Sequence, residues 1–359
     1  MTETGRASFK EEYKSYTSRK VLLILACVAL AVLFLGLSVY FGGSDLSLGH
    51  IYQLIWDHLT GKTYEIGTDD FHDDYIVWKV RLPRAVFALI AGAGLAVGGA
   101  VMQSVMKNPL ADPYTTGISS GACLGMAVAM ILGISMGGAT YGAGGVVNSF
   151  VFAIIPMIVM IMISQRFGSS PATMILAGVA ISYMFNAGTT LLMMITDADT
   201  LSAVYRWQVG SLSDITWNSV PVMAVINMVG IVVLLFLSKK LNVLSLGDEN
   251  AKSLGLNVDM MRVVCLLILT MMVASVVCYC GIIGFVGLVV PHIVRRIIES
   301  DNLFVIPASA AVGAVFMLGA DSLARYLSPM DNIPVGVILS LIGAPIFLYI
   351  IIRSKREVW

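Results

Sequence analysis

The chain has 359 residues, of which 58% are hydrophobic and only 12% are charged, and its 22 basic and 22 acidic residues cancel. A soluble protein of this length needs more charge to cover its surface, so the composition excludes a soluble globular protein and predicts a polytopic membrane protein. No basic stripe with interleaved aromatic residues is present, so no nucleic-acid partner is expected.

The first 20 residues mix Lys and Arg with Glu and are predicted to form a cytosolic N-terminal tail. The apolar run at 21–41 is longer than the core of a signal peptide, which has about 7–15 residues, and no small-residue cleavage site follows it. We therefore expect a retained first span.

About 20 apolar residues are needed to cross a bilayer as a helix. Reading along the chain, the segments that meet this condition are 21–41, 83–105, 114–137, 146–164, 172–195, 217–238, 261–280, 283–298, 303–326 and 333–352. The expected fold is an all-α bundle of about ten transmembrane helices, forming a single domain over 21–359.

The basic residues orient this bundle. With the N-terminus inside, sixteen of the 22 Lys and Arg residues lie on the inner side and six on the outer side. This positive-inside bias predicts that both termini are cytosolic. Halves at roughly 21–210 and 211–359, of five helices each, would then have opposite topology, as in the inverted repeats of transporters.

Arg81 and Arg84 open the second span in the motif RLPR, on the outer side, where the orientation rule gives no reason for positive charge. Pro83 suits the first turn of a helix, which predicts the pair at a helix N-terminus, where the macrodipole disfavours cations. Arg325, at the outer end of the ninth span, is expected at the same mouth. The three arginines either reach lipid phosphates or dock an acidic partner, since Arg pairs with carboxylates through two hydrogen bonds.

Just before these arginines, residues 65–74 contain five acidic residues and a histidine. A solvated acidic loop is the favoured interpretation. Neutralisation of the arginines and a carboxylate–histidine metal site are the alternatives.

Motifs typical of enzymes are present only in part. GISSG at 117–121 has the letters of a nucleophile elbow, but it opens a predicted helix and has no preceding strand. GKT at 61–63 lacks the first glycine of a phosphate-binding loop and is predicted outside the cell. All five cysteines lie in apolar segments, so no disulfide and no metal site is expected. The chain is predicted to be a transport subunit with no catalytic residues.

Seven longer motifs resemble the FecCD family, the permease subunits of ABC importers for iron-siderophores, haem and vitamin B12. They are RLPR (81–84), GAVMQSVMKNPLADPYTTGISSGA (99–122), LAGVAIS (176–182), LGDENAKSLGLNV (246–258), GFVGLVVPHIVRR (284–296), LGADSLAR (318–325) and IPVGVILSLIGAPIFLYII (333–351). The resemblance implies ten helices per subunit in the cytoplasmic membrane, with the translocation path between two permeases, either copies or paralogues. It also implies a cytosolic ATPase dimer that binds ATP and Mg²⁺, a substrate-binding protein outside, and no cofactor in this chain.

The same resemblance assigns roles to single residues. Arg81, Arg84 and Arg325 match arginines that pair with glutamates of the binding protein. Asn108 and Leu110 match cytosolic gate positions of the vitamin B12 importers. The ATPase coupling element corresponds to 246–258, with Gly247, Asp248, Glu249, Ala251, Leu254, Gly255 and Leu256.

The residues of this coupling element agree with that role. It is cytosolic by the charge bias and is broken by Gly247 and Gly255. Between them a short helix over 248–254 is predicted, with Ala251 and Leu254 on one face, suited to a groove on a partner.

On the fifth span, Ser182, Asn186 and Thr189 recur at i, i+4 and i+7. This polar stripe either lines the path or hydrogen-bonds to a neighbouring helix.

An ion-coupled secondary transporter is the competing function. Such carriers use ionisable residues within the membrane, and the central portions of these spans contain almost none.

For the ABC importer, an iron(III)-siderophore is the expected cargo, with haem and cobalamin as alternatives.

Overall fold

The computed structural model describes residues 3–42, 46–136, 143–168, 170–328 and 333–354, and within these ranges the regular structure is entirely helical. Seven helical stretches are long and apolar enough to cross a membrane, and the bent pair α9 and α10 makes an eighth. The helices that carry these seven stretches are α1 (Glu3–Tyr40), α4 (Leu82–Met106), α6 (Ala143–Phe167), α7 (Pro171–Met194), α12 (Val258–Cys280), α14 (Asn302–Leu327) and α15 (Val335–Ser354). The prediction of a polytopic all-α membrane protein is confirmed.

The eighth stretch is bent by 59° between α9 (Val220–Phe236) and α10 (Ser238–Ser245). Two further predicted spans fall on shorter helices, α5 (Ile118–Leu132, 15 residues) and α13 (Val286–Ile298, 13 residues). At 1.5 Å per residue these helices measure roughly 20–23 Å, less than the ~30 Å hydrocarbon core.

Irregular backbone fills the remaining depth beside the short helices. The segment before α5 turns back into the bundle, where the Pro113 ring lies against Gly98 of α4 and Gly287 of α13. The residue before α13, Phe285, has a left-handed backbone with φ of 69°. Non-helical backbone is tolerated at membrane depth where protein surrounds it, and Pro113 is buried.

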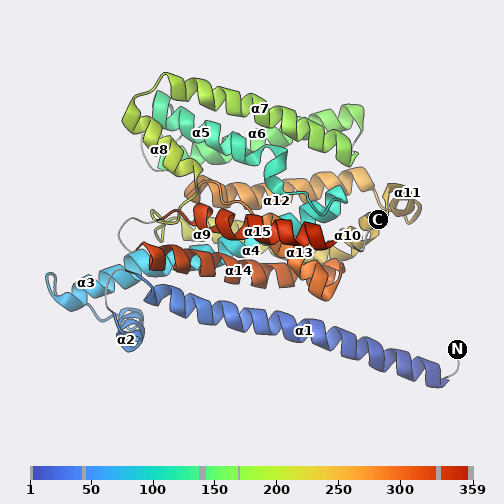
Figure 1. The fold of residues 1–359 in the computed structure, drawn as a ribbon, viewed down its shortest axis with the longest axis horizontal. Coiled ribbons are helices and arrows are strands. Elements are labelled where there is room, and N and C mark those ends of the chain that lie inside the picture. The colour runs from blue at the N-terminus through green and yellow to red at the C-terminus, as the bar shows by residue number, and fades with distance from the viewer. Residues whose placement is uncertain (1–2, 43–45, 137–142, 169, 329–332, 355–359) are drawn as a thin grey trace.

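Helix α4 is the centre of the bundle and packs against α9, α12, α13 and α14. In Figure 1, α1 lies along α14 on one side, while α5, α6 and α7 form a separate layer that reaches the rest through α12. Glycines let α4 approach its neighbours closely: Gly92 of α4 lies against Gly313 of α14, and Gly99 of α4 lies against Gly287 of α13.

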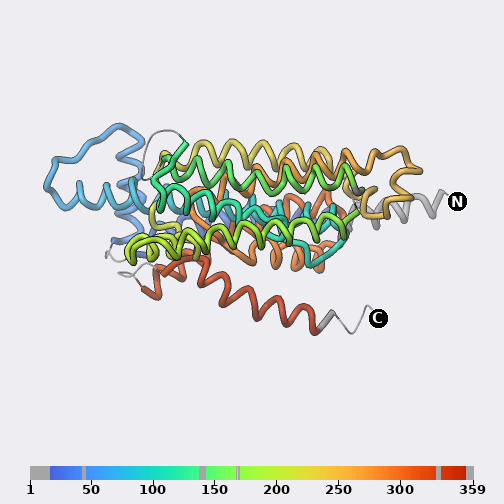
Figure 2. Tube along the Cα trace, turned by 90° about the horizontal axis from the view of Figure 1, so that it is seen from above, coloured from blue at the N-terminus to red at the C-terminus, as the bar shows by residue number. Residues whose placement is uncertain are grey.

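The two ends of the bundle differ. One end carries α2 (Leu48–Leu59), α3 (Asp69–Tyr75) and α8 (Ala198–Gln208), and the opposite end carries α11 (Asp248–Ser253) and the start of α1 (Figure 1). Figure 2 shows that α15 runs toward the end that carries α11. These are called the α2 end and the α11 end below.

Candidate functional sites at the two ends of the bundle

Three arginines and one carboxylate gather at the α2 end, where α4 meets α14. Arg84 donates from Nε to Oδ1 of Asp321 at 2.9 Å, and Arg325 donates from Nη2 to Oδ2 at 2.8 Å. Asp321 is fully buried, and both arginines are nearly so. Both oxygens of one buried carboxylate are therefore engaged, each by a different arginine.

The same cluster holds the end of α1. Arg81 donates from Nη1 to the carbonyls of Val39 and Tyr40 at 3.0 and 3.2 Å, and Arg325 donates from Nη1 to the carbonyl of Phe41 at 2.9 Å. The last carbonyls of a helix lack partners within the helix and carry the negative end of its dipole. Two cations therefore cap the end of the first predicted span.

The structure confirms that Arg81, Arg84 and Arg325 lie together, but the predicted helix N-terminus at Arg81 is wrong. α3 and the π-helical segment η1 (Ile76–Arg81) run into α4 without a break, so that one helical stretch spans Asp69–Met106. The wide π turn, in which Leu82 N–H donates to the Val77 carbonyl, accommodates Pro83 inside a helix. The arginines therefore lie away from the positive end of the helix dipole, and their docking role stays a prediction.

Most of the acidic segment is helical: Glu65 lies in the turn after α2, whereas the four aspartates lie on α3, which pairs with α2. Asp73 lies 3.3 Å from Nε2 of His50, and Asp74 lies 3.2 Å from Nδ1 of His58, so α3 is held to α2. The His58 ring stacks on Trp78 with centroids 4.0 Å apart. Among the described residues no group of three or more side chains is arranged to hold a metal.

At the α11 end, Asp248 begins the segment predicted for coupling. Arg262 donates from Nη1 and Nη2 to the two carboxylate oxygens of Asp248, both at 2.8 Å, and Lys107 Nζ lies 2.6 Å from Oδ1. The hydrogen bonds from Arg262, with those from Lys107, outweigh desolvation and lower the pKa of Asp248 to about 2. This carboxylate stays ionised at any physiological pH and joins α11 to α12 and to the end of α4.

The predicted short helix over 248–254 is confirmed as α11, which lies between two glycines of positive φ, Gly247 at 104° and Gly255 at 82°. The predicted shared face is wrong. Ala251 is fully buried against the chain, whereas Leu254 is 65% exposed. Leu254 instead borders a hollow of about 270 Å³, which Lys239, Lys240, Val243, Gly255 and Leu256 also line.

The gate candidates lie one and three residues beyond Lys107. Lys107 adopts a left-handed conformation with φ of 49° and ends α4. Asn108 accepts the Leu110 N–H on its side-chain oxygen at 2.9 Å and so closes the turn, while Leu110 is 50% exposed. The lysine that contacts Asp248 is thus covalently next to the predicted gate.

The three polar residues of α7 lie on one side of the helix but differ in exposure. Ser182 and Thr189 donate to carbonyls of their own helix, those of Gly178 and Phe185, at 2.8 and 3.1 Å, and Thr189 is buried. Asn186 is exposed. Thr189 also hydrogen-bonds to the Cys123 thiol of α5, which favours contact with a neighbouring helix as the role of this residue, while lining of a path by the three residues stays a prediction.

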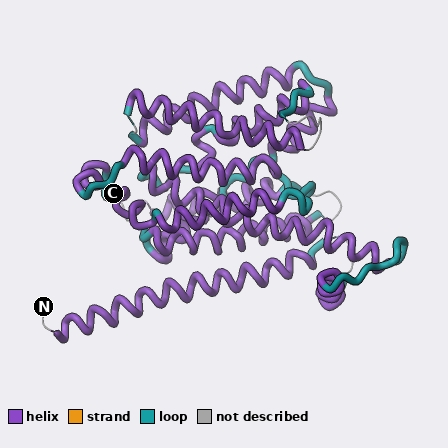
Figure 3. The backbone as a smooth tube through the Cα atoms, turned by 180° about the vertical axis from the view of Figure 1, so that it is seen from behind, coloured by secondary structure: helices purple, strands orange, loops and turns teal. Residues whose placement is uncertain are grey.

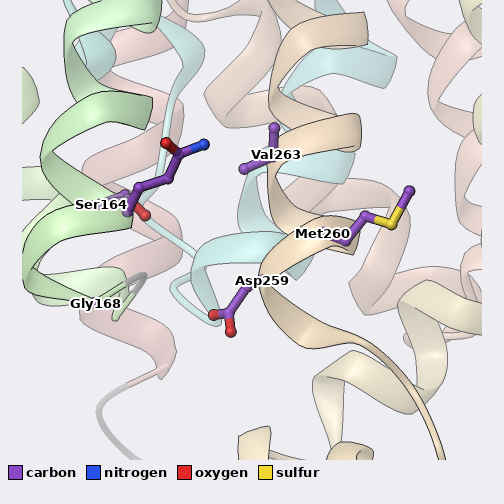
Figure 4. A pocket seen from close by; sticks show the side chains of 6 residues that line it. Ser164, Gly168, Asp259, Met260 and Val263 are labelled. Carbon is purple, nitrogen blue, oxygen red and sulfur yellow. The ribbon is translucent and has the colours of Figure 1, made fainter.

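Two hollows were missed by sequence reasoning. One, of about 490 Å³, lies between α6 and α12 at the α11 end, with Ser164 and Asp259 on opposite sides (Figure 4). The other, of about 640 Å³, lies under α8 at the α2 end and is lined by Arg206, Trp207 and Tyr279 among others. Each is made by elements that are distant in sequence, so no local pattern marks it.

Comparisons with known proteins agree with this architecture. Residues 26–353 match the FecCD transport family. The iron(3+)-hydroxamate import system permease FhuB of Bacillus subtilis is 31% identical over 98% of this chain and 88% of its own length. The cobalamin import system permease BtuC of Halobacterium salinarum is 37% identical over 79% of this chain and 74% of its own length.

A solved structure described as an inward-facing metal-chelate type ABC transporter superposes with a TM-score of 0.80 at 29% identity. It covers 92% of this chain and 98% of its own. With the family model matching nearly the whole apolar region and the bundle superposing on a solved transporter, the chain belongs to the FecCD transport family and is a multi-pass protein of the cytoplasmic membrane.

Proposed function

We propose that this chain is the permease subunit of an ABC importer that carries an iron(III)-siderophore or a similar metal chelate into the cytosol. The observation that carries the proposal is the family match over 26–353, supported by relatives whose names state import of iron hydroxamate and by a solved metal-chelate transporter. Cobalamin is the second candidate cargo, because a cobalamin permease is 37% identical to this chain. Haem is a further alternative.

The topology we propose has ten crossings and both termini in the cytosol. Two of the ten crossings are α5 and α13, and in each the irregular backbone before the short helix supplies the rest of the length needed to cross the membrane. The α2 end is then extracellular and the α11 end cytosolic, in agreement with the positive-inside bias. The helices up to α8 and those from α9 onward form two halves of five crossings with opposite topology.

Each end of the bundle is assigned its own binding partner. A cytosolic ATPase dimer, which binds ATP and Mg²⁺, docks at α11 and the hollow beside Leu254. A substrate-binding protein docks at the α2 end. A second permease, either a copy of this chain or a paralogue, packs against the apolar faces that α7 and α15 expose. On α7 the side chains of Leu176, Tyr183 and Leu191 are 66–74% exposed. On α15 those of Leu341 and Leu348 are 60–67% exposed.

Docking at the arginine cluster involves exchange of hydrogen-bond partners. Arg81 bonds to the last carbonyls of α1 and Arg325 to the carbonyl of Phe41 just after it, and both arginines are nearly buried. Carboxylates of a binding protein form stronger hydrogen bonds with guanidinium groups than neutral carbonyls do. Docking therefore competes with the carbonyls at the end of α1 for these two arginines, while Arg84 stays with Asp321.

Coupling in this proposal runs from α11 to the gate. ATPase closure moves α11, Asp248 transmits the movement to Arg262 and Lys107, and Lys107 moves Asn108 and Leu110. Alternating access then depends on the Asp248 carboxylate, which contacts Arg262 of α12 and Lys107 at the end of α4. No group of this chain takes part in ATP hydrolysis.

ATP-driven uptake into proteoliposomes tests the function. The purified complex, with its ATPase inside and binding protein outside, is expected to accumulate an iron(III)-hydroxamate only with internal ATP. Accumulation of cobalamin but not the iron chelate would assign the second cargo. Uptake by the permease alone, driven by a proton gradient, would instead support the ion-coupled carrier and refute the proposal.

A further inference from the structure

Helix α2 exposes an apolar stripe of four large side chains. Leu48, Tyr52, Trp56 and Leu59 are 41%, 56%, 67% and 66% exposed. They are separated by four, four and three residues, so they lie on one side of the helix. Large apolar side chains that align in this way mark a surface that something apolar covers.

The rest of α2 is divided between protein and water. Ile51 and Leu54 are buried, and with them α2 rests on the chain. The titratable groups point to partners in the hairpin: His50 lies near Asp73, and Asp57 accepts from Lys62 and Tyr64. The stripe itself therefore carries no charge.

The direction of α2 suits a helix lying in a membrane surface. α2 is seen end-on in Figures 1 and 3, whereas α1 and α14 lie in the plane of both views. α2 therefore runs across the spans rather than along them. It begins eight residues after α1 ends at Tyr40, which places it where α1 leaves the hydrocarbon core.

The exposed side of α2 also faces toward the depth of the membrane. The Tyr52 hydroxyl lies against Gly36 of α1, one turn inside the end of that helix. The stripe thus points back along α1 toward the middle of the bundle and away from the space in which a binding protein would dock. Farther along its length, α1 exposes Leu22, Leu25 and Leu33, the pattern of a helix that faces lipid.

We propose that α2 is an interfacial membrane anchor, with Leu48, Tyr52, Trp56 and Leu59 inserted among the lipid headgroups and upper acyl chains of the leaflet at the α2 end. Tyr and Trp are enriched at this level of a bilayer, and amphipathic helices bind there through their apolar face. Which leaflet this is depends on the proposed orientation of the bundle. Insertion itself requires neither cargo nor ATP, so it is tested separately from transport.

Trp56 provides the probe. The assembled transporter is reconstituted in phosphatidylcholine nanodiscs with and without lipids brominated near the headgroup end of the acyl chains, and the fluorescence of the Trp56→Phe variant is subtracted. We expect the Trp56 signal to be blue-shifted, to fall at least twofold with brominated lipid, and to be insensitive to aqueous iodide. A matched control moves the indole off α2 to the exposed Glu65 in the turn between α2 and α3, as Glu65→Trp in the Trp56→Phe background, where iodide and not bromine should quench.

The quenching results distinguish lipid, water and a protein partner as the surroundings of Trp56. Quenching of Trp56 by iodide alone would show a water-exposed face and refute the anchor. A signal reached by neither quencher would show a protein partner on the stripe and would refute it as well. Since Trp56 is exposed, its replacement by Phe is not expected to disturb folding, and ATP-driven uptake by the same variant checks that the complex is intact.

Discussion

Asp248 and Arg262 form a bidentate ion pair between α11 and α12, with both nitrogen–oxygen distances at 2.8 Å. Arg262 is almost wholly buried, whereas Asp248 keeps a third of its side chain exposed. The buried arginine therefore depends on a carboxylate at the very start of the proposed coupling element.

Replacing Asp248 by Asn should uncouple ATP hydrolysis from transport. The amide keeps the shape but leaves Arg262 and Lys107 without a charged acceptor, which we expect to cost about 2 kcal/mol of local stability. The measurement is uptake per ATP hydrolysed in proteoliposomes, expected to fall several-fold while the ATPase still co-purifies. Lys252→Gln, at an exposed position of α11, is the control and should keep the wild-type ratio. Loss of the ATPase from the complex would instead indicate a role in docking, and an unchanged ratio would contradict coupling through Asp248.

The same ion pair gives a prediction about pH. The pKa of Asp248 is lowered to about 2 in the folded chain, below the ~3.9 of an unfolded aspartate. A depressed carboxyl pKa contributes stability that is fully present above the unfolded value and is lost as the pH falls through the folded value. The part of the difference in unfolding free energy between wild type and Asp248→Asn that comes from this charge should therefore be constant above about pH 5 and be lost progressively as the pH falls to about 1. A difference that changes between pH 5 and 8 would show that another group titrates with the pair.

Arg81 and Arg84 are three residues apart but should behave differently when replaced by Ala. Arg81 donates to two carbonyls at the end of α1, whereas Arg84 pairs with Asp321. Loss of a cation that caps a helix C-terminus costs about 1–2 kcal/mol. Amide hydrogen exchange in 34–41 should therefore rise about tenfold in Arg81→Ala and much less in Arg84→Ala.

The two variants also separate the two roles of the arginines. If binding-protein affinity falls in Arg81→Ala while exchange in 34–41 stays at the wild-type rate, the arginine serves docking without capping α1. If exchange rises and affinity is unchanged, the arginine serves only the fold. Equal exchange in both variants would contradict the capping of α1 by Arg81.

Local patterns predicted the helices and the sites that depend on them, but not the contacts between distant segments. Apolar runs located the spans, and positive charge on the outer side drew attention to Arg81, Arg84 and Arg325. Asp321 stands four residues before Arg325, a spacing that pairs side chains on a helix, and this signal could have identified it as the buried counter-ion.

The contact of Lys107 with Asp248 joins positions 141 residues apart, so nothing in either segment indicates it. The face of α11 was mispredicted because a helix of six residues is too short for periodicity to distinguish its buried side. The helix N-terminus at Arg81 was mispredicted because Pro83 usually begins a helix, and here a π turn lets the helix continue through it.

The last prediction concerns the packing of α4, where adjacent glycines offer a matched pair. A Cβ at Gly99 would overlap the backbone carbonyl of Gly287 in α13, which cannot move as a side chain can. A Cβ at Gly98 would meet only the side chains of Val273 and Pro113, at 3.3 and 3.7 Å. Overpacking costs about 1–3 kcal/mol, with backbone clashes at the upper end, so Gly99→Ala should lower the thermal unfolding temperature in detergent clearly more than Gly98→Ala. α13 also packs against α14 and α15, so it is not free to shift away from α4 to relieve the overlap. Equal unfolding temperatures for the two variants would show that α13 is free to move away from α4, and the packing described for these two helices would then be wrong.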